Sequence, residues 1–485
     1  MLSLLRAIAS HSPTRRAFIQ APVVGDAIAT QLRPYSIRSK LVDVAAREGE
    51  LRVFLVAGEV SGDTIASRLM QGLQDLSPVP VKFTGVGGES MRKRGLESIF
   101  PMEELAVMGL WELLPHIANI RRRINYTVEA AVLFQPHIVV TVDCKGFSFR
   151  LLKLLRSRFV QSNYGPLHIH YVAPSFWAWK GGEERLKGLR HFIDHILCIL
   201  PFEAQICNLN GLPATYVGHP LLDDASSINP LLTVHHIDSP VMVSESEKQE
   251  HQRKVEAFLK HNGLFPGSNI VTLLPGSRLQ EVRRMLPIYA EAMQLLKKSF
   301  PDLSCVIPIA PNRQVQSYID KAAQSFPVST VLIPGASLET KYIAFNVSKV
   351  ALCTSGSAVM ELMLAGLPCV VSYRAHLITE WLIHFKKKIN FISLPNILLN
   401  TKVIPEVLFR NCTPENLVEA LREVLLDKKV QEMQIDSAKR IVRMLDQSME
   451  QKKEHADLCL IRSPGYIAAW TILYAEKNFH CTKHS

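Results

Sequence analysis

A small-residue turn between a buried strand and a helix carries the strongest chemical signal in this chain. The apolar run 350–353 predicts the strand, and Ser355-Gly356-Ser357 follows it at the predicted start of the helix. Backbone N–H groups at a helix N-terminus bind phosphate, and the helix dipole favours negative charge there. Glu361 lies about one turn further on, where a carboxylate can accept hydrogen bonds from a ribose. The pattern favours a nucleotide site, although an ordinary capped helix explains the turn when it is taken alone.

A second polar loop follows the predicted strand 270–274. Gly276 lets the backbone approach a ligand, and Ser277 can cap the next helix. The planar guanidinium of Arg278 suits the oxygens of a phosphate. We predict that these three residues bind the phosphates of a nucleotide together with the turn 355–357; a solvated Arg on a capped helix is the alternative.

The loop after the predicted strand 51–57 carries two carboxylates, Glu59 and Asp63, with Ser61 and Gly62 between them. It lacks the G-x-G-x-x-G of a dinucleotide site and the G-K-[ST] of a P-loop, which argues against dehydrogenases and P-loop NTPases. We expect Glu59 and Asp63 to act in catalysis, and Ser61 and Gly62 to contact an acceptor. Helix capping is the alternative for this loop.

Asp143 ends a further apolar strand, predicted over 138–142. Ligands of open parallel sheets bind beyond the carboxyl ends of the strands, so this carboxylate is placed to face them. An ionised carboxylate there can remove a proton from a sugar hydroxyl as a general base. The alternative is a local cap ahead of the helix that begins near Ser148.

The order of predicted elements indicates an α/β protein with two domains. Strands alternate with helix-length segments from residue 51, and the alternation resumes at residue 270 after a polar, charged stretch. Such alternation predicts parallel sheets with helices on both faces. The expected segments are a disordered transit peptide at 1–45, a Rossmann-like N-terminal domain at 51–222, a linker with a charged insertion at 223–265, a second Rossmann-like domain at 266–430, and C-terminal helices without strands at 431–485. These helices are expected to dock on the N-terminal domain or on a partner subunit.

Composition and charge are those of a globular protein with a basic leader. The chain is 47% hydrophobic and 20% charged, and no apolar run is long enough for a membrane-spanning helix. Residues 1–40 hold six basic residues and one acid, Asp26, so they carry +5 of the net charge of +11. An Arg-containing, acid-poor leader is typical of organelle transit peptides. We predict a mitochondrial rather than a plastid protein; a tail without an address is the alternative.

Three other motifs are expected to support the structure rather than the chemistry. Trp177 and Trp179 are two residues apart, so in an extended segment they would share one face and pack together. His219 precedes a proline at the predicted domain junction, where a hinge role is favoured over that of a base. The basic run 386–388 is interpreted as a solvated face.

Several motifs together make the chain resemble the lipid-A-disaccharide synthases, glycosyltransferase family 19, which have the GT-B fold of two Rossmann-like domains around a central cleft. The resemblance runs from about Val53 to Glu419. Its most specific elements are Pro174-Ser175-Phe176-Trp177-Ala178-Trp179 and Gly218-His219-Pro220, and weaker ones lie at 57–63, 200–203, 274–278, 364–368 and 392–396. The leader and the charged stretch at 241–260 differ from bacterial members, which points to a plant mitochondrial member.

The resemblance implies an inverting transfer from UDP-2,3-diacylglucosamine to 2,3-diacylglucosamine 1-phosphate, with the β-1,6 lipid A disaccharide 1-phosphate and UDP as products. It also implies that the domain at 51–222 binds the acceptor and that the domain at 266–430 binds the UDP-sugar. Asp143 matches the family's catalytic aspartate, Arg278 and the turn 355–357 would offset charge on the leaving diphosphate, and Glu361 would hold the ribose. No metal or other cofactor and no nucleic-acid partner is expected. The alternatives are another GT-B enzyme, such as a UDP-sugar 2-epimerase or a hexosaminyltransferase, and a non-catalytic nucleotide-sugar or lipid-binding relative.

The acylated substrates imply contact with a bilayer, which we expect to be peripheral to the inner mitochondrial membrane. The predicted patch joins an apolar segment to a basic cluster, a combination that suits an anionic lipid interface. Its members are Met108, Leu110, Trp111, Leu114, Arg121, Arg122 and Arg123. A core helix with a solvated end is the alternative. The family's C-terminal helices can be exchanged between subunits, so Trp470 and Tyr474 would dock on the partner in a domain-swapped homodimer.

Overall fold

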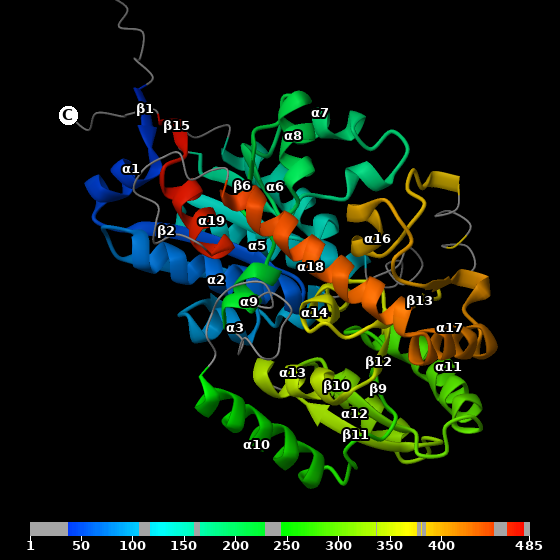
Figure 1. The fold of residues 1–485 in the computed structure, drawn as a ribbon. Coiled ribbons are helices and arrows are strands. Elements are labelled where there is room, and N and C mark those ends of the chain that lie inside the picture. The colour runs from blue at the N-terminus through cyan, green and yellow to red at the C-terminus, as the bar shows by residue number, and fades with distance from the viewer. Residues whose placement is uncertain are drawn as a thin grey trace, which may run out of the picture.

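The computed structural model describes residues 37–105, 117–159, 165–227, 244–335, 337–375, 380, 385–450 and 463–479. They form two α/β domains, each built on a parallel sheet, and two C-terminal helices that run back across the N-terminal domain (Figure 1). The predicted fold class, two Rossmann-like domains, is confirmed. No helix among these residues has the length and apolar character needed to cross a bilayer.

The N-terminal sheet has seven parallel strands in the order β4-β3-β2-β5-β6-β7-β8. They are β2 (Leu51–Ala57), β3 (Val81–Val86), β4 (Glu97–Ser98), β5 (Ile138–Val142), β6 (Leu167–Tyr171), β7 (His195–Cys198) and β8 (Ala214–Tyr216). The central strands are buried nearly throughout, because helices cover both faces of the sheet. The chain starts in the middle with β2, builds β3 and β4 to one side, and returns to build β5 on the other. The winding therefore reverses between β2 and β5.

Helices cover each face of this sheet in a separate apolar layer. One layer packs α1 (Leu41–Glu48), α2 (Val60–Leu76) and α19 (Pro464–Leu473) against the strands. The other layer holds α5 (Ile117–Phe134), α6 (Lys145–Phe159), α7 (Glu184–Leu189) and α8 (Pro201–Leu209). Shorter elements, α3 (Glu89–Lys93), η1 (Met102–Leu105) and η3 (Phe176–Ala178), fill the connections.

The C-terminal sheet repeats the winding with six parallel strands in the order β11-β10-β9-β12-β13-β14. They are β9 (Ile270–Leu274), β10 (Ser304–Ile309), β11 (Ser329–Pro334), β12 (Val350–Thr354), β13 (Cys369–Tyr373) and β14 (Glu406–Leu408). One face is covered by α11 (Leu279–Lys297), α12 (Arg313–Ala323) and α17 (Pro414–Leu426). The other face carries α9 (Leu221–Ser227), α13 (Leu338–Val347), α14 (Ser357–Leu364), α16 (Leu394–Leu399) and α18 (Lys428–Glu450). Here the winding reverses between β9 and β12.

The charged stretch that was expected to be an exposed linker is largely a helix, α10 (Glu245–His261). Ser244 caps it, because its side chain accepts from the N–H of Glu247, and the Glu247 carboxylate accepts from the Ser244 N–H in return. Leu259 is buried in a small cluster against the C-terminal sheet. Most of the helix is exposed, as expected of a charged insertion, and its few apolar residues share the face that packs on the C-terminal domain.

The ends of the described chain form a two-stranded antiparallel sheet, in which β1 (Ile37–Lys40) pairs with β15 (Glu476–Phe479). The next helix, α1, buries Leu41 and Ala45 completely. The prediction of disorder is therefore wrong for residues 37–45, and the prediction of a strand-free C-terminus is wrong for β15. Each strand has only four residues, and its partner lies at the opposite end of the chain, so no local pattern reveals the pairing.

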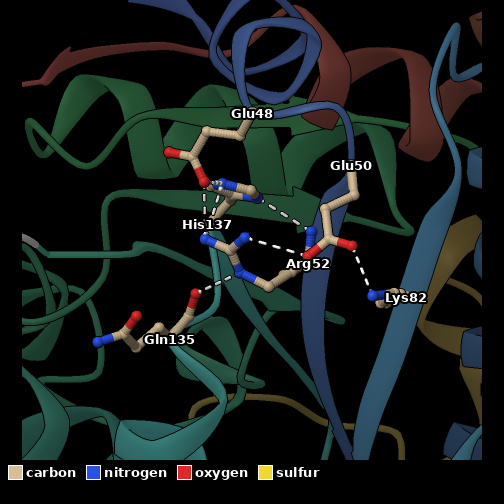
Figure 2. Close-up of polar contacts among 6 residues, drawn as sticks. All are labelled: Glu48, Glu50, Arg52, Lys82, Gln135 and His137. Carbon is tan, nitrogen blue, oxygen red and sulfur yellow. Dashed lines mark hydrogen bonds and ion pairs between the residues drawn. The ribbon is translucent and has the colours of Figure 1, made fainter.

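A polar network fixes α1 to the amino ends of the central strands (Figure 2). The buried His137 ring accepts the N–H of Arg52 at Nδ1 (2.9 Å), and its Nε2 lies 2.9 Å from the Glu48 carboxylate. The Arg52 guanidinium donates to Glu48 (2.8 Å), to Glu50 (3.2 Å) and to the Gln135 carbonyl (2.9 Å). Burial lowers the pKa of His137. This network lies at the sheet edge opposite the carboxyl ends of the strands, so we assign it to the fold and not to the chemistry.

The C-terminal helices tie the two domains together. The long helix α18 starts on the C-terminal domain and reaches the N-terminal one (Figure 1), where Tyr216 donates a hydrogen bond to the Leu445 carbonyl (3.1 Å). After it, α19 packs on α2 of the same chain, and a Cβ at Gly72 would approach that of Ala469 to 2.9 Å. Docking on the chain's own N-terminal domain is one of the two expected arrangements. Trp470 and Tyr474 stack on each other at 4.8 Å and remain partly exposed.

Candidate functional site

The predicted polar loops lie where each sheet reverses its winding. Glu59 follows β2 and Asp143 follows β5, the two strands between which the N-terminal sheet reverses. Arg278 follows β9 and Ser355 follows β12, the corresponding strands of the C-terminal sheet. The crevice at such a reversal is the usual ligand site of open α/β sheets. The winding thus places four of the predicted residues at the two positions where a ligand is expected.

An ion pair between Glu59 and Arg278 joins the two crevices. Arg278 Nη2 contacts Glu59 Oε2, and both side chains are largely buried. Burial raises the pKa of Glu59, the nearby Asp143 carboxylate raises it further, and the Arg278 guanidinium opposes both effects. The carboxylates of one domain and the guanidinium of the other therefore lie in one electrostatic cluster between the domains.

The backbone holds Asp143 in an unfavourable conformation. Asp143 and Cys144 have φ of +49° and +43°, in the left-handed region that residues other than glycine seldom adopt. The Asp143 N–H donates to the Tyr171 carbonyl (2.9 Å), and the Ser148 hydroxyl donates to the Asp143 carbonyl (2.9 Å). These bonds fix the strained turn from both sides. Strain of this kind is concentrated at functional sites, where it directs a side chain toward a ligand.

Cys144 is a neighbour of the cluster that the sequence did not single out. Its side chain packs against Gly58, where an added Cβ would lie 2.7 Å from the Cys144 sulfur. Burial, followed by the charges of Glu59 and Asp143, raises the pKa of Cys144 to about 12. The thiol therefore stays protonated and is not a nucleophile at neutral pH.

The loop after β2 is shorter than predicted, because α2 begins at Val60. Asp63 is only 4% exposed, and its carboxylate accepts the N–H groups of Gly88 (2.8 Å), Ser90 (2.9 Å) and Met91 (3.1 Å). Both of its oxygens thus hold the start of α3, so we replace the expected catalytic role of Asp63 with this structural one. The two predicted acceptor contacts also differ: Ser61 is exposed, whereas Gly62 is buried.

A half-buried carboxylate that the sequence analysis missed, Glu281, shapes the loop after β9. The Ser277 backbone and the Thr354 side chain lie close enough to Glu281 to lower its pKa, so Glu281 connects this loop to the end of β12. Burial raises the pKa of Glu281, and Arg278 opposes the shift. Gly276 has a φ of +123°, and a Cβ there would lie 2.3 Å from the Glu281 carboxylate. The sequence signal for this contact is the position of Glu281, five residues after Gly276.

Replacement of Gly276 by alanine is expected to distort this loop. The new Cβ would clash with the Glu281 carboxylate, and the positive φ would add strain of roughly 1–3 kcal/mol. We expect Gly276→Ala to lower UDP affinity by about tenfold or more, measured by calorimetry, with a small loss in the melting temperature. Gly267→Ala is the matched control, because that glycine also has positive φ, +83°, but no atom within 4 Å of the added Cβ. Equal UDP affinity in both variants would refute this role of Gly276.

Glu361 lies on α14 as predicted, with a partner that was not foreseen. Lys341 of α13 forms an ion pair with Glu361 Oε2. The preceding turn is also anchored, because the Ser355 hydroxyl donates to the Ile392 carbonyl (3.4 Å). Gly356 is the N-cap of α14, and Ser357 is its first residue. The expected helix start is confirmed, so the N–H groups of this turn are available at the carboxyl end of β12.

The predicted membrane patch is described only in part. Four apolar members lie outside the described residues: Met108, Leu110, Trp111 and Leu114. Arg121 and Arg122 are exposed on α5. Arg123 pairs with Glu104 (2.5 Å), and its guanidinium lies 4.8 Å from the centre of the Phe100 ring. Arg123 therefore contacts its own domain and is not a simple solvated charge.

A short backbone contact crosses between the domains near the tryptophan motif. The N–H of Lys180 donates to the Lys386 carbonyl (2.9 Å), and the N–H of Lys388 donates to the Ala178 carbonyl (2.8 Å). Lys386 and Lys388 are exposed, as a solvated face requires, but the segment also joins the two domains. The Lys388 ammonium adds an ion pair with Glu183 (3.0 Å) to the two backbone hydrogen bonds.

Trp177 packs as expected, but not in an extended segment, since Phe176–Ala178 form the 3₁₀ helix η3. Its indole N–H donates to Glu203 (2.9 Å), and its ring meets that of Phe202 edge to face at 5.5 Å. Burial raises the pKa of Glu203 to about 7. The backbone of Trp179 forms an isolated antiparallel β-bridge with that of Lys387.

His219 lies buried at the domain junction, where its Nδ1 accepts the N–H of Leu221 (3.1 Å). Nearby, Arg68 of α2 donates to the Pro220 carbonyl (3.0 Å) and pairs with Asp224 of α9. Burial lowers the pKa of His219 to about 4. The ring is therefore neutral at physiological pH, which agrees with a structural role.

This depressed pKa predicts acid sensitivity. A buried His that stays neutral contributes stability above its unfolded pKa, and that stability is lost as the pH falls toward the folded value. Between about pH 7.5 and about pH 5 the loss is expected to reach about 2 kcal/mol. Denaturant titrations of the wild type and His219→Asn, which keeps an acceptor for Leu221, measure it as the difference between the two pH dependences. Parallel pH profiles would contradict the prediction.

Comparison with known proteins identifies the family to which these features belong. A family model described as lipid-A-disaccharide synthetase matches residues 53–237 and 229–460. The chain belongs to the lipid-A-disaccharide synthase family. Among its relatives, the probable mitochondrial lipid-A-disaccharide synthase of Arabidopsis thaliana is 49% identical over 450 residues, which cover 91% of this chain and 95% of that protein. The lipid-A-disaccharide synthase of Rhodospirillum centenum is 36% identical, covering 82% of this chain and 90% of that protein.

The family membership confirms the expected enzyme class, a glycosyltransferase. A solved structure adds the fold alone: the S. aureus MnaA–UDP co-structure has a TM-score of 0.51 at 12% identity, over 82% of this chain and 97% of that chain. The matched chain thus has the two-sheet arrangement derived above. In this member of the lipid-A-disaccharide synthase family, the site residues are assigned from the geometry of the loops and from the sequence motifs.

Proposed function

We propose that this chain is an inverting glycosyltransferase that joins UDP-2,3-diacylglucosamine to 2,3-diacylglucosamine 1-phosphate, with the β-1,6 lipid A disaccharide 1-phosphate and UDP as products. The observation that carries the proposal is the contact between Glu59 and Arg278, because it sets the loop after β2 opposite the loop after β9. Asp143 belongs to the same electrostatic cluster. The proposed carboxylate base and the proposed phosphate-binding cation are thus close to each other between the domains.

In the proposed reaction Asp143 takes the proton from the 6-hydroxyl of the acceptor. The oxygen attacks the anomeric carbon from the face opposite UDP, the glycosidic bond to the diphosphate breaks, and the configuration inverts. General base catalysis of this kind contributes roughly 10²–10⁴-fold to the rate. The fixed backbone of the turn supports the role, because it limits the directions in which the carboxylate can point.

The leaving UDP gains negative charge as the bond breaks. Arg278 and the N–H groups of the turn 355–357 would stabilise that charge, since preorganised donors act most strongly where charge develops. The dipole of α14 adds to the effect. Gly276 and Ser277 would bring the backbone close to the phosphates, and Glu361 would accept from the ribose. Glu59 would orient Arg278 and release it to the ligand.

We also propose where the enzyme acts and how its subunits assemble. The name of the Arabidopsis relative and the basic leader at 1–40 support a mitochondrial protein. We propose that the enzyme binds the periphery of the inner membrane, where diacylated substrates are held. Exposed Arg121 and Arg122 support a basic contact with anionic lipid. Exchange of α19 between two subunits remains a proposal, which light scattering tests: a monomer would refute it.

The proposed function is tested with the purified full-length chain, UDP-2,3-diacylglucosamine and 2,3-diacylglucosamine 1-phosphate. We expect UDP release that depends on the acceptor, and a disaccharide 1-phosphate detected by mass spectrometry. UDP release that does not depend on the diacylated acceptor would indicate another UDP-sugar enzyme. Binding of UDP without any product would indicate a non-catalytic relative, and either result would overturn the proposal.

A further inference from the structure

The ion pair between Lys341 and Glu361 spans the two helices that flank β12. Lys341 lies on α13, before the strand, and Glu361 lies on α14, after it. Glu361 Oε2 is buried, and its contact is this ion pair rather than an aligned hydrogen bond. The Glu361 side chain still keeps 21% of its surface exposed, and that of Lys341 keeps 25%. The carboxylate is thus anchored through one oxygen while part of the side chain remains accessible.

The surroundings of the pair are rich in acidic groups. Asp224 lies close enough that Glu361 raises its pKa, while burial is the largest cause of the shift and Arg68 and Lys341 lower it. Tyr342, beside Lys341, is fully buried, and its hydroxyl has no hydrogen-bond partner in the described part of the chain. Burial raises the pKa of Tyr342, and the charges of Glu361 and Asp224 add to the effect. Without Lys341, Glu361 would therefore add an uncompensated negative charge beside the turn 355–357.

A negative charge there has two consequences for a nucleotide diphosphate. Repulsion between like charges in a partly buried site would weaken binding of the phosphates. A carboxylate without its anchor would also rotate, and a hydrogen bond to a ribose hydroxyl depends strongly on angle. A cation that neutralises Glu361 and fixes its orientation removes both costs.

We propose that Lys341 is a positioning residue for nucleotide recognition. Its ammonium holds the Glu361 carboxylate so that the free oxygen accepts a hydrogen bond from a ribose hydroxyl. The inference rests on the proposed function for the identity of the ligand, a uridine diphosphate. It adds a residue that does not itself touch the nucleotide but sets the selectivity of the site for ribose over deoxyribose.

The test compares the affinities of UDP and 2′,3′-dideoxy-UDP, measured by calorimetry. A hydrogen bond to a charged group contributes about 1.5–3 kcal/mol, so the wild type is expected to prefer UDP by roughly 10- to 150-fold. We expect Lys341→Met to reduce this preference to less than about threefold, because the carboxylate loses its fixed orientation, and we expect the same of Glu361→Gln, which removes the charge. Lys341→Arg should keep most of the preference, because it retains the charge.

The controls separate this role from a purely structural one. Lys349→Met removes an exposed lysine just beyond the end of the same helix, where it pairs with Asn269 (2.9 Å), and should keep the wild-type preference. If Lys341→Met is unstable, Lys341→Gln gives the same comparison with a smaller loss of polarity. An unchanged preference for UDP in a folded Lys341 variant would overturn the inference, as would a wild type that binds both nucleotides equally.

The outcome for the proposed function is read separately. If the wild type forms the disaccharide but the Lys341 variants keep its nucleotide preference, the inference alone is refuted. A wild type that neither binds UDP nor forms the disaccharide refutes the function and the inference together.

Discussion

Asp143→Asn is expected to lower kcat by roughly 10²–10⁴-fold while the affinity for the UDP-sugar stays within about twofold of the wild type. The amide has nearly the same shape as the carboxylate but cannot accept the hydroxyl proton. Its effect therefore falls on the transition state and not on ground-state binding. Single-turnover rates of disaccharide formation and calorimetry of the UDP-sugar measure the two quantities independently.

The control for this variant is Asp436→Asn, which makes the same change on an exposed surface of α18, where the Asp436 side chain is 72% exposed. It should leave rate and affinity unchanged. A further variant, Ser148→Ala, removes the hydroxyl that donates to the Asp143 carbonyl. We expect it to lower kcat by a smaller factor, because it loosens the turn but keeps the base. Full activity of Asp143→Asn would exclude a general base at this position.

Arg278→Ala is expected to weaken UDP binding by roughly 10- to 150-fold, the loss that corresponds to one charge-assisted hydrogen bond to the diphosphate. The rate of transfer should fall as well, by about 10²–10³-fold, because Arg278 also stabilises the leaving group. Arg278→Lys should restore part of the affinity but less of the rate, since an ammonium lacks the planar fork. Calorimetry with UDP and steady-state kinetics check both parts.

Arg283→Ala is the matched control, because Arg283 is exposed on the same helix and lies over the Tyr318 ring at 5.7 Å, away from the loop. The variant should behave as the wild type. Arg278→Ala also leaves Glu59 without its partner, so the double variant with Glu59→Gln tells the two effects apart. If the double variant regained wild-type UDP affinity, the loss in Arg278→Ala would come from the unpaired Glu59 charge, and direct binding of phosphate by Arg278 would be refuted.

The central strands could be predicted from the sequence with their bounds. Leu51–Ala57, Ile138–Val142 and Ile270–Leu274 are β2, β5 and β9 as expected. These strands are covered on both faces, so their residues are continuously apolar and polar residues mark where they end. The same pattern predicts the loops that carry Asp143 and Arg278, because the first polar residues after an apolar strand mark its carboxyl end.

The missed elements depend on contacts that no local pattern contains. β4, β8 and β14 have only two or three residues, too few for a period to be detected, and their neighbours in the sheets hold them. The role of Asp63 was also hidden, because its three donors lie 25 or more residues further along the chain. Glu281 and Lys341 were missed for a related reason: their importance comes from where a neighbouring helix places a partner.

The sheet of β1 and β15 has a consequence for how the chain acquires its structure. β1 finds its partner among the last residues that the structure describes, and α19 covers the apolar face of α2 from the same region. During synthesis, the N-terminal domain therefore cannot complete its fold before the C-terminal end has been made. Until that end has been made, the apolar face of α2 that α19 covers stays exposed to solvent.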